Sequence, residues 1–194
     1  MPGPVCLIAP EGLSARLQSR LAQAGCAADW LGAAPPAAVP QNALQLSVVG
    51  TSTAITSLDS VEIAVVLDHP LAEHLGWMLA VSGNANALRQ AARWLDALAP
   101  VPRGWLHVGS AGAAAFVGGI NALWAEQQQR IIAWLAERGP RGAAHFDPAS
   151  WQLLAQQTQS ELHALARRYL AGNPAPDEIA TRLARAIAML YPGT

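Results

Sequence analysis

The pattern of hydrophobic residues changes near residue 110, and this change restricts the fold more than any other feature of the chain. Up to residue 108, short apolar runs rich in Val, Ile and Leu alternate with segments whose apolar residues recur at helical spacing. After residue 110, three long helical segments follow with no strand-like run between them. Strands that alternate with helices are typical of an α/β layer. The sequence therefore predicts an α/β domain over residues 1–109 and an all-helical domain over residues 110–194.

The boundaries of the predicted elements follow from local signals. Strands are expected at 5–8, 27–31, 44–49, 61–67, 77–81 and 105–108, and the 44–49 and 61–67 runs have the composition of buried parallel strands. Helices are expected over 13–24, 84–98, 111–138, 148–171 and 176–190. Gly25 is placed to end the first helix as a C′ glycine, and Asp147 with Pro148 forms an N-cap and N1 pair.

Composition excludes several classes of partner. The chain has 194 residues, of which 52% are hydrophobic, so it is long enough to bury a core. Only 13% of the residues are charged and the formal net charge is −1, so the chain has no excess of positive charge. We therefore expect no binding to nucleic acid or to an anionic membrane surface. No targeting segment and no run near the roughly 20 apolar residues of a membrane span is present, which predicts a cytoplasmic protein.

Cysteine and histidine usage favours structural roles. Cys6 and Cys26 lack Cys-x-x-Cys spacing and are predicted to be buried free thiols. The five histidines form no metal-binding pair, so no metal site is predicted.

Several segments, taken in order, resemble the β-hydroxyacid dehydrogenase and 6-phosphogluconate dehydrogenase superfamily. The matching segments are VCLIAPEGLS at 5–14, TST at 51–53, LDHP at 67–70, LAVSGN at 79–84, WLDAL at 94–98 and HVG at 107–109. The resemblance implies a truncated Rossmann-like parallel sheet, a long interdomain helix and a helical domain of the kind that pairs two subunits. It also implies NAD(P) as cofactor, with Gly12, Ser14, Ser52 and Thr53 as candidate binding residues.

The segment that would hold the pyrophosphate departs from the family pattern. Glycines allow backbone amides to approach a phosphate at a helix N-terminus, but this turn reads Ala9-Pro10-Glu11-Gly12. The Glu11 carboxylate beside a diphosphate would cost about 1–4 kcal/mol. At the end of the second predicted strand, residues 31–33 include neither an acidic residue that could bind the ribose nor an arginine that could bind a 2′-phosphate. These changes argue against ordinary NAD(P) binding.

The chain contains no lysine, so the catalytic lysine implied by the resemblance has no counterpart. The family's Lys-x-x-x-Asn pair falls on Gly118 and Ala122 in one register and on Val117 and Asn121 in the other. The substrate-binding Ser-Gly-Gly loop is missing after Pro70, and at least one strand–helix unit is missing before residue 51.

The remaining catalytic candidates are Asn121, Asp68 and His69; the last two lie at a strand's carboxyl end, where α/β sheets place ligands. Gly118 and Gly119 each cost about 1 kcal/mol in a helix relative to alanine, which predicts a close backbone contact with another helix, in the same chain or across a dimer. A ligand that approaches this bare side of the helix is the less favoured alternative.

Three functional hypotheses follow. The favoured one is a degenerate dehydrogenase relative without hydride transfer, acting as a dimeric binding or interaction protein, with a homodimer formed by the C-terminal helices and a partner protein as a further option. The alternative is a divergent NAD(P)-dependent oxidoreductase acting on a small carbonyl or imine. A third is a sensor for a mononucleotide or an acyl group.

Overall fold

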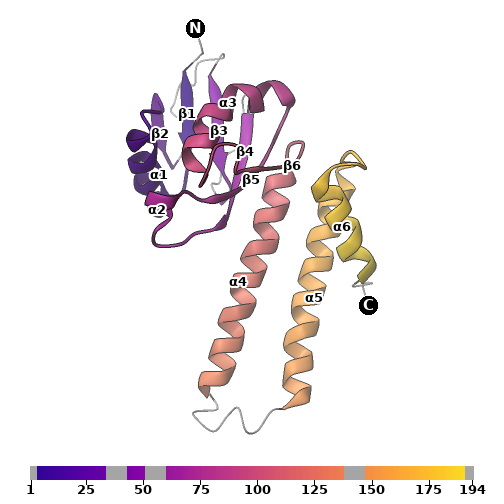
Figure 1. Ribbon diagram of the computed structural model, residues 1–194. Helices are drawn as coiled ribbons and strands as arrows, with labels where there is room; N and C mark the ends of the chain where they lie inside the picture. The colour runs from indigo at the N-terminus through magenta and orange to yellow at the C-terminus, as the bar shows by residue number, and fades with distance from the viewer. Residues whose placement is uncertain (1–3, 34–42, 51–59, 138–146, 191–194) are drawn as a thin grey trace.

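The computed structural model describes residues 4–33, 43–50, 60–137 and 147–190. A six-stranded sheet comes first and long helices follow, as Figure 1 shows. The strands are β1 (Val5–Ile8), β2 (Trp30–Gly32), β3 (Leu44–Val48), β4 (Ser60–Leu67), β5 (Met78–Gly83) and β6 (Leu106–Gly109). The helices are α1 (Glu11–Gln23), α2 (Ala72–Leu75), α3 (Ala85–Leu98), α4 (Ala113–Glu137), α5 (Pro148–Ala171) and α6 (Ile179–Leu190). The predicted fold class, a Rossmann-like α/β part followed by helices, is confirmed.

The sheet has the order β2-β1-β3-β4-β5-β6. All neighbouring pairs are parallel except β4 and β5, which are antiparallel, so the prediction of an entirely parallel sheet is wrong at this pair. The reason is the connection between Leu67 and Met78, which holds only the four-residue helix α2. A parallel pair needs a crossover of a dozen or more residues, whereas a short turn reverses the chain.

One face of the sheet is covered by α1 and α3. Leu17 and Leu21 of α1 are buried, as are Leu95 and Leu98 of α3, and all four belong to one hydrophobic cluster with the strands. Trp77 is fully buried in the same cluster. This layer is the larger of the two hydrophobic cores.

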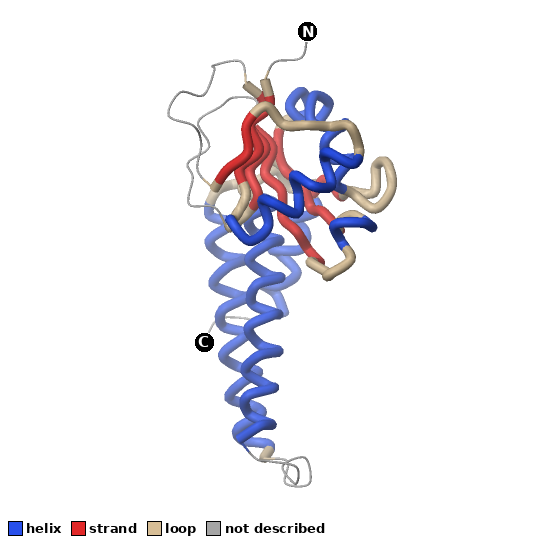
Figure 2. The backbone as a smooth tube through the Cα atoms, turned by 90° about the vertical axis from the view of Figure 1, so that its left-hand side faces the viewer, coloured by secondary structure: helices blue, strands red, loops and turns tan. Residues whose placement is uncertain are grey.

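The other face is covered by helices that follow the sheet in sequence. Phe116 of α4, Leu162 of α5 and Ala184 of α6 form a second cluster with Ala64 of β4 and Ala80 of β5. α4 and α5 then continue beyond the sheet as an antiparallel hairpin, which Figure 2 shows from the side. We call the part formed by residues 124–137 and 148–161 the stalk.

Polar contacts join the two helices of the stalk. Arg130 contacts both carboxylate oxygens of Glu161 at 3.1 Å, and Thr158 donates a hydrogen bond to Gln127. The hydrogen bonds from Arg130 lower the pKa of Glu161. In the described ranges, no helix combines the length and the apolarity that a membrane crossing requires.

Most local boundary signals are confirmed. Gly25 has φ +64° directly after the end of α1, and Asp147 accepts a hydrogen bond from the backbone of Ala149 at 3.1 Å. The second strand is shorter and later than predicted, at Trp30–Gly32, and α6 begins at Ile179. The short helix α2 was not predicted, because four residues carry too little periodicity to be recognised.

Cys6 and Cys26 are free and buried, as predicted. Burial raises the pKa of the Cys6 thiol, and the charge of Asp29 raises it further. Cys6 is therefore held in its unreactive thiol form.

Candidate functional site

The turn between β1 and α1 lies at the carboxyl edge of the parallel strands. Pro10 is the N-cap of α1, and its carbonyl accepts hydrogen bonds from the N–H groups of Leu13 and Ser14 at 2.9 Å. The N–H groups of Glu11 and Gly12 therefore remain as the donors that a phosphate could use at this helix terminus. Glu11 is exposed and supplies negative charge at the same place.

The predicted cofactor residues differ in what surrounds them. A Cβ atom added at Gly12 would meet nothing within 4 Å, so the space beside this residue is open. The hydroxyl of Ser14 donates to the backbone oxygen of Glu11 at 3.0 Å and thus has a partner within its own helix. Ser52 and Thr53 lie outside the described residues. The binding role of these four residues stays a prediction.

Asp68 and His69 form a corner that is held by α1. Arg16 donates to Asp68 at 2.9 Å and to the backbone oxygen of His69 at 2.9 Å, and Asp68 also accepts from Trp77 Nε1 at 3.1 Å. His69 Nδ1 accepts from the backbone N–H of Leu71 at 3.1 Å. The Asp68 side chain therefore joins α1 to the turn between β4 and β5, whereas the His69 side chain is bonded within that turn.

A second arginine of α1 secures the same corner. Arg20 donates to the backbone oxygens of Ala97 and His74, at 2.9 and 2.5 Å. Arg16 and Arg20 were not singled out from the sequence, because their partners lie more than 50 residues away along the chain. Their spacing of four residues, which places them on one side of α1, was the available signal.

Gly118 and Gly119 allow α4 to approach two different elements. A Cβ atom at Gly118 would lie 3.0 Å from Cγ1 of Val49 and 3.4 Å from Cβ of Ala64, so this glycine packs on the sheet. A Cβ atom at Gly119 would lie 3.0 Å from the side chain of Leu165 in α5. The prediction of a contact with another helix is thus correct for Gly119, within the same chain, and wrong for Gly118. Sequence spacing alone cannot tell which neighbour a bare helix position will meet.

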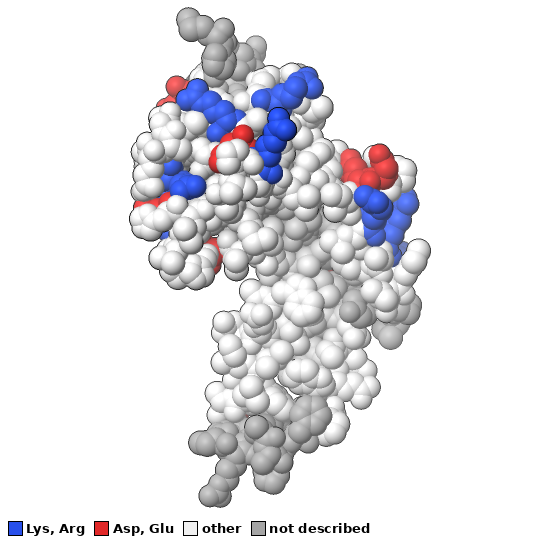
Figure 3. Space-filling view, viewed as in Figure 1, with Lys and Arg blue, Asp and Glu red and all other residues white. Residues whose placement is uncertain are grey.

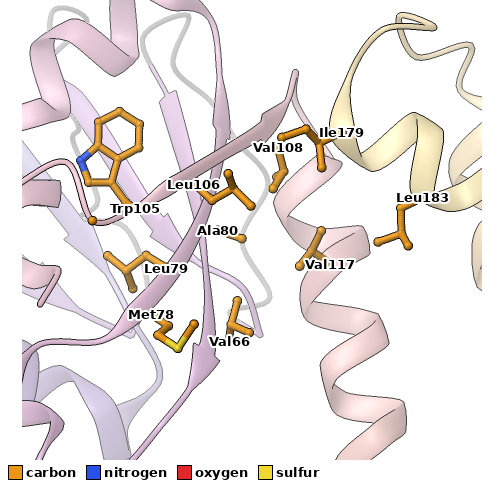
Figure 4. Close-up of a pocket in the computed structure, with 11 residues that line it drawn as sticks. Val66, Met78, Leu79, Ala80, Trp105, Leu106, Val108, Val117, Ile179 and Leu183 are labelled. Carbon is orange, nitrogen blue, oxygen red and sulfur yellow. The ribbon is translucent and has the colours of Figure 1, made fainter.

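In the other alignment register, the lysine position of the family falls on Val117. This residue lines an apolar pocket of about 360 Å³ between the sheet, α4 and α6, shown in Figure 4. Its other walls come from β4, β5 and β6, the turn before β6, and α6: Val66, Met78, Leu79, Ala80, Gly104, Trp105, Leu106, Val108, Ile179 and Leu183. No charged side chain lines this pocket.

The catalytic candidates that the sequence suggested do not lie together in one site. Asp68 is bonded to Arg16 and Trp77 in the layer of α1 and α3, whereas Asn121 lies on α4, which packs on the opposite face of the sheet. Asn121 is partly buried. A shared catalytic centre of Asp68, His69 and Asn121 therefore does not fit this arrangement.

A polar network that sequence reasoning missed fixes the start of α4. One oxygen of Glu62 accepts from the Ser82 hydroxyl at 2.7 Å and from the Gly112 N–H at 2.8 Å. Glu178 accepts from the Ser110 N–H at 3.0 Å and from Tyr169 at 3.3 Å. Two carboxylates thus face the positive end of α4, which is a stabilising arrangement. Burial, with the charges of Glu178 and Glu62, raises the pKa of Tyr169, so this residue stays a neutral phenol.

The packing at Gly118 gives a stability prediction. We expect Gly118→Leu to lower the free energy of unfolding by about 2 kcal/mol, because overpacking against Val49 and Ala64 outweighs the helix propensity gained. Urea unfolding followed by circular dichroism measures this difference. The control Ala122→Leu adds the same side chain at an exposed position of α4 and should change stability by less than about 0.5 kcal/mol. Equal stability of the two variants would contradict the close packing of α4 on the sheet.

The fold and the carboxyl-edge turn define a Rossmann-like α/β part joined to a helical region. Among solved structures, the chain is similar to the 3-hydroxyisobutyrate dehydrogenase of Mycobacterium tuberculosis, solved with L-serine. The match has a TM-score of 0.48 and 15% sequence identity, and covers 98% of this chain and 94% of the other. No protein-family model matches the chain, and no curated protein is significantly similar to it in sequence.

Proposed function

We propose that this protein is a dehydrogenase-fold binding protein that does not transfer hydride. In this proposal residues 1–109 form a reduced nucleotide-binding-type domain, and residues 110–194 form a helical domain that pairs two copies. The alternative function, an NAD(P)-dependent oxidoreductase with a divergent site, is supported by the retained order of strands and helices.

The environment of residues 117 and 118 carries the proposal. These are the two positions at which the resemblance implies a proton-transferring lysine. Gly118 packs against Val49 and Ala64 with no room for a long side chain, and Val117 lines an apolar pocket. A general acid or base must lie within hydrogen-bond reach of the reacting group. Neither position offers such a group.

The charge at the first turn of α1 supports the same proposal. The exposed carboxylate of Glu11 stands at the helix terminus where a pyrophosphate would bind, and the helix dipole already stabilises it there. A dinucleotide would add two further negative charges at this point. The turn is therefore arranged to keep its own carboxylate and to disfavour a diphosphate.

Nicotinamide binding is the direct test. We expect titration with NADPH and NADH, followed by tryptophan quenching and nicotinamide emission, to show no saturation below about 1 mM. Glu11→Gln should strengthen residual binding by roughly tenfold or more, because removal of one like charge at intermediate dielectric is worth about 1–4 kcal/mol. Glu137→Gln, which removes an exposed carboxylate at the far end of α4, is the charge-matched control. Saturation of the wild-type protein at micromolar NADPH would instead favour the divergent oxidoreductase.

Total exposed surface supports the pairing of two copies. The chain exposes 11121 Å² at a mass of 20.3 kDa. A compact monomer of this mass exposes about 8,800 Å², so the excess is roughly 2,300 Å² per chain. Obligate dimer interfaces bury about 2,000–5,000 Å² in total, to which each subunit contributes half. The excess is thus large enough for a stable homodimer, and light scattering at micromolar concentration should give twice the mass of the chain.

A further inference from the structure

The apolar pocket between the sheet, α4 and α6 has a buried floor and an exposed rim. Leu79 and Ala80 of β5 lie at the floor and are only 3% and 2% exposed. Leu106 of β6 and Leu183 of α6 lie at the rim and are 53% and 39% exposed. The volume of about 360 Å³ falls within the usual range of small-molecule sites. A ligand of matching size would therefore cover apolar side chains that otherwise face water.

The walls of this pocket favour an apolar occupant. The lining side chains are apolar, and the one N–H among them, that of Trp105, already donates to Asp96 at 2.8 Å. A buried water molecule needs two to four polar partners, and these side chains do not supply them. Because a dry cavity of about 150 Å³ can hold benzene, this pocket has room for roughly twelve carbon atoms.

A second pocket, of about 290 Å³, adjoins the first at the turn before β6. Its walls include Asp96, Arg103 and Trp105, and Trp105 also lines the apolar pocket. Arg103 and Gly104 are neighbours in the chain, and each of them lines one of the two pockets. A molecule that occupies the apolar pocket can therefore pass Trp105 and place one end beside the guanidinium of Arg103.

Arg103 is fixed at this boundary by its backbone. Its φ is +60°, a left-handed conformation that is uncommon outside glycine. Its backbone N–H donates to Asp96 Oδ1 at 2.7 Å, the same oxygen that accepts from Trp105. The side chain of Arg103 is exposed, and within the described ranges its guanidinium forms no ion pair, not even with Asp96. Its positive charge is therefore available to a ligand.

The figures show how charge is distributed around the two pockets. In Figure 4 the Trp105 ring lies at one side of the apolar pocket, whereas Ile179 and Leu183 lie at the opposite side. In the view of Figure 3, charged side chains gather over the sheet part and near α6, and the surface between them carries none. An amphipathic molecule can thus lie with its chain in the uncharged region and its charged end at the turn that holds Arg103.

We propose that the two pockets together bind a medium-chain carboxylate. Its aliphatic chain, of roughly eight to twelve carbon atoms, occupies the apolar pocket, and its carboxylate pairs with the guanidinium of Arg103. An arginine can donate two parallel N–H bonds to a carboxylate, which favours this head group over a hydroxyl or an amine. The proposed function assigns no ligand, so this inference goes beyond it, and it uses none of the residues of the β1–α1 turn.

Calorimetric titration with straight-chain carboxylates tests the position of the chain. We expect octanoate to bind with a dissociation constant below about 0.5 mM. Each further CH₂ group should tighten binding by about fourfold, until the chain fills the pocket at roughly twelve carbon atoms. Burial of the chain also predicts a negative heat-capacity change on binding. A dissociation constant that does not change with chain length would overturn the placement of the chain in the pocket.

Head-group analogues and Arg103→Gln test the ion pair. We expect octanol and octylamine to bind at least about tenfold more weakly than octanoate, because neither can pair with a guanidinium. Arg103→Gln should weaken octanoate binding by about tenfold and leave octanol binding unchanged. Arg89→Gln, at an exposed position of α3, is the charge-matched control and should change neither. Equal effects of the two arginine variants would overturn the ion pair.

A charge at the rim tests the apolar pocket itself. We expect Leu183→Asp to weaken the binding of octanoate and of octanol alike by at least about tenfold, because it places a carboxylate beside the chain. Leu153→Asp, at a 67% exposed position of α5, is the control and should leave both unchanged. Circular dichroism of each variant verifies folding.

Two results would overturn the site as a whole. One is the absence of octanoate binding up to about 5 mM. The other is a loss of octanoate binding as the protein concentration rises and two copies associate, which would assign the pocket to a second copy. Nicotinamide binding has its own titration, so this inference can fail while the proposed function stands.

Discussion

Replacement of Trp77 by alanine is expected to lower the free energy of unfolding by about 3–5 kcal/mol, the range for removal of a buried tryptophan. Trp77 has no exposed surface and belongs to the core beneath α1 and α3. Its indole N–H donates to Asp68 at 3.1 Å, and the Arg16 guanidinium lies 5.6 Å from its ring centroid. The substitution would leave a cavity and would remove one of the partners of Asp68.

Comparison with Trp77→Phe separates packing from hydrogen bonding. Phenylalanine keeps most of the ring volume but cannot donate to Asp68, so a loss of about 1–2 kcal/mol is expected. Urea unfolding of both variants gives the two differences. A Trp77→Ala variant as stable as the wild-type protein would contradict the central position of this residue in the core.

Gly76→Ala is expected to destabilise the protein by at least about 3 kcal/mol through backbone strain and steric overlap. Gly76 has φ +90°, a conformation that residues with a Cβ atom rarely adopt. A Cβ atom there would lie 2.4 Å from the carbonyl carbon of Ala99 and 2.5 Å from Pro100 N, which are backbone atoms that cannot move aside alone. The turn that reverses the chain into β5 therefore requires glycine at this position.

The matched control for this prediction is Gly12→Ala. A Cβ atom at Gly12 would meet nothing within 4 Å, and in the first turn of α1 alanine is a better helix former than glycine. Its stability should equal or slightly exceed that of the wild-type protein in thermal unfolding. Equal effects of the two substitutions would show that the turn at Gly76 is not held as closely as described.

Two arginines of α1 and two glycines of α4 show which contacts local sequence signals cannot predict. Leu17 and Leu21 predict the buried side of α1, but Arg16 and Arg20 bind groups more than 50 residues away that no local pattern reveals. Gly118 and Gly119 predict close contacts on α4, and the sequence could not assign one to the sheet and the other to α5. Position along a helix is local information, whereas the identity of the neighbour is not.

The properties of the candidate site also divide into those that the sequence carries and those that depend on packing. The glutamate in the first turn of α1 and the absence of lysine are properties of the sequence, and any fold of this chain retains them. The separation of Asp68 from Asn121 depends on which face of the sheet each helix covers. The sequence predicted Asp68 at a strand's carboxyl end and Asn121 on the long helix, but only the packing of α1 and α4 on opposite faces sets them apart.

The sequence by itself determined the kinds of elements, most of their ends and the missing acid/base group. Hydrophobic spacing, caps such as Asp147 and the C′ glycine Gly25 act over a few residues, so they can be recognised without a partner. Tertiary structure decided the antiparallel β5, the apolar surroundings of Val117 and the packing of Gly118 on the sheet. These features depend on contacts between segments distant in sequence, which form only when the layers pack and their surfaces compete for burial.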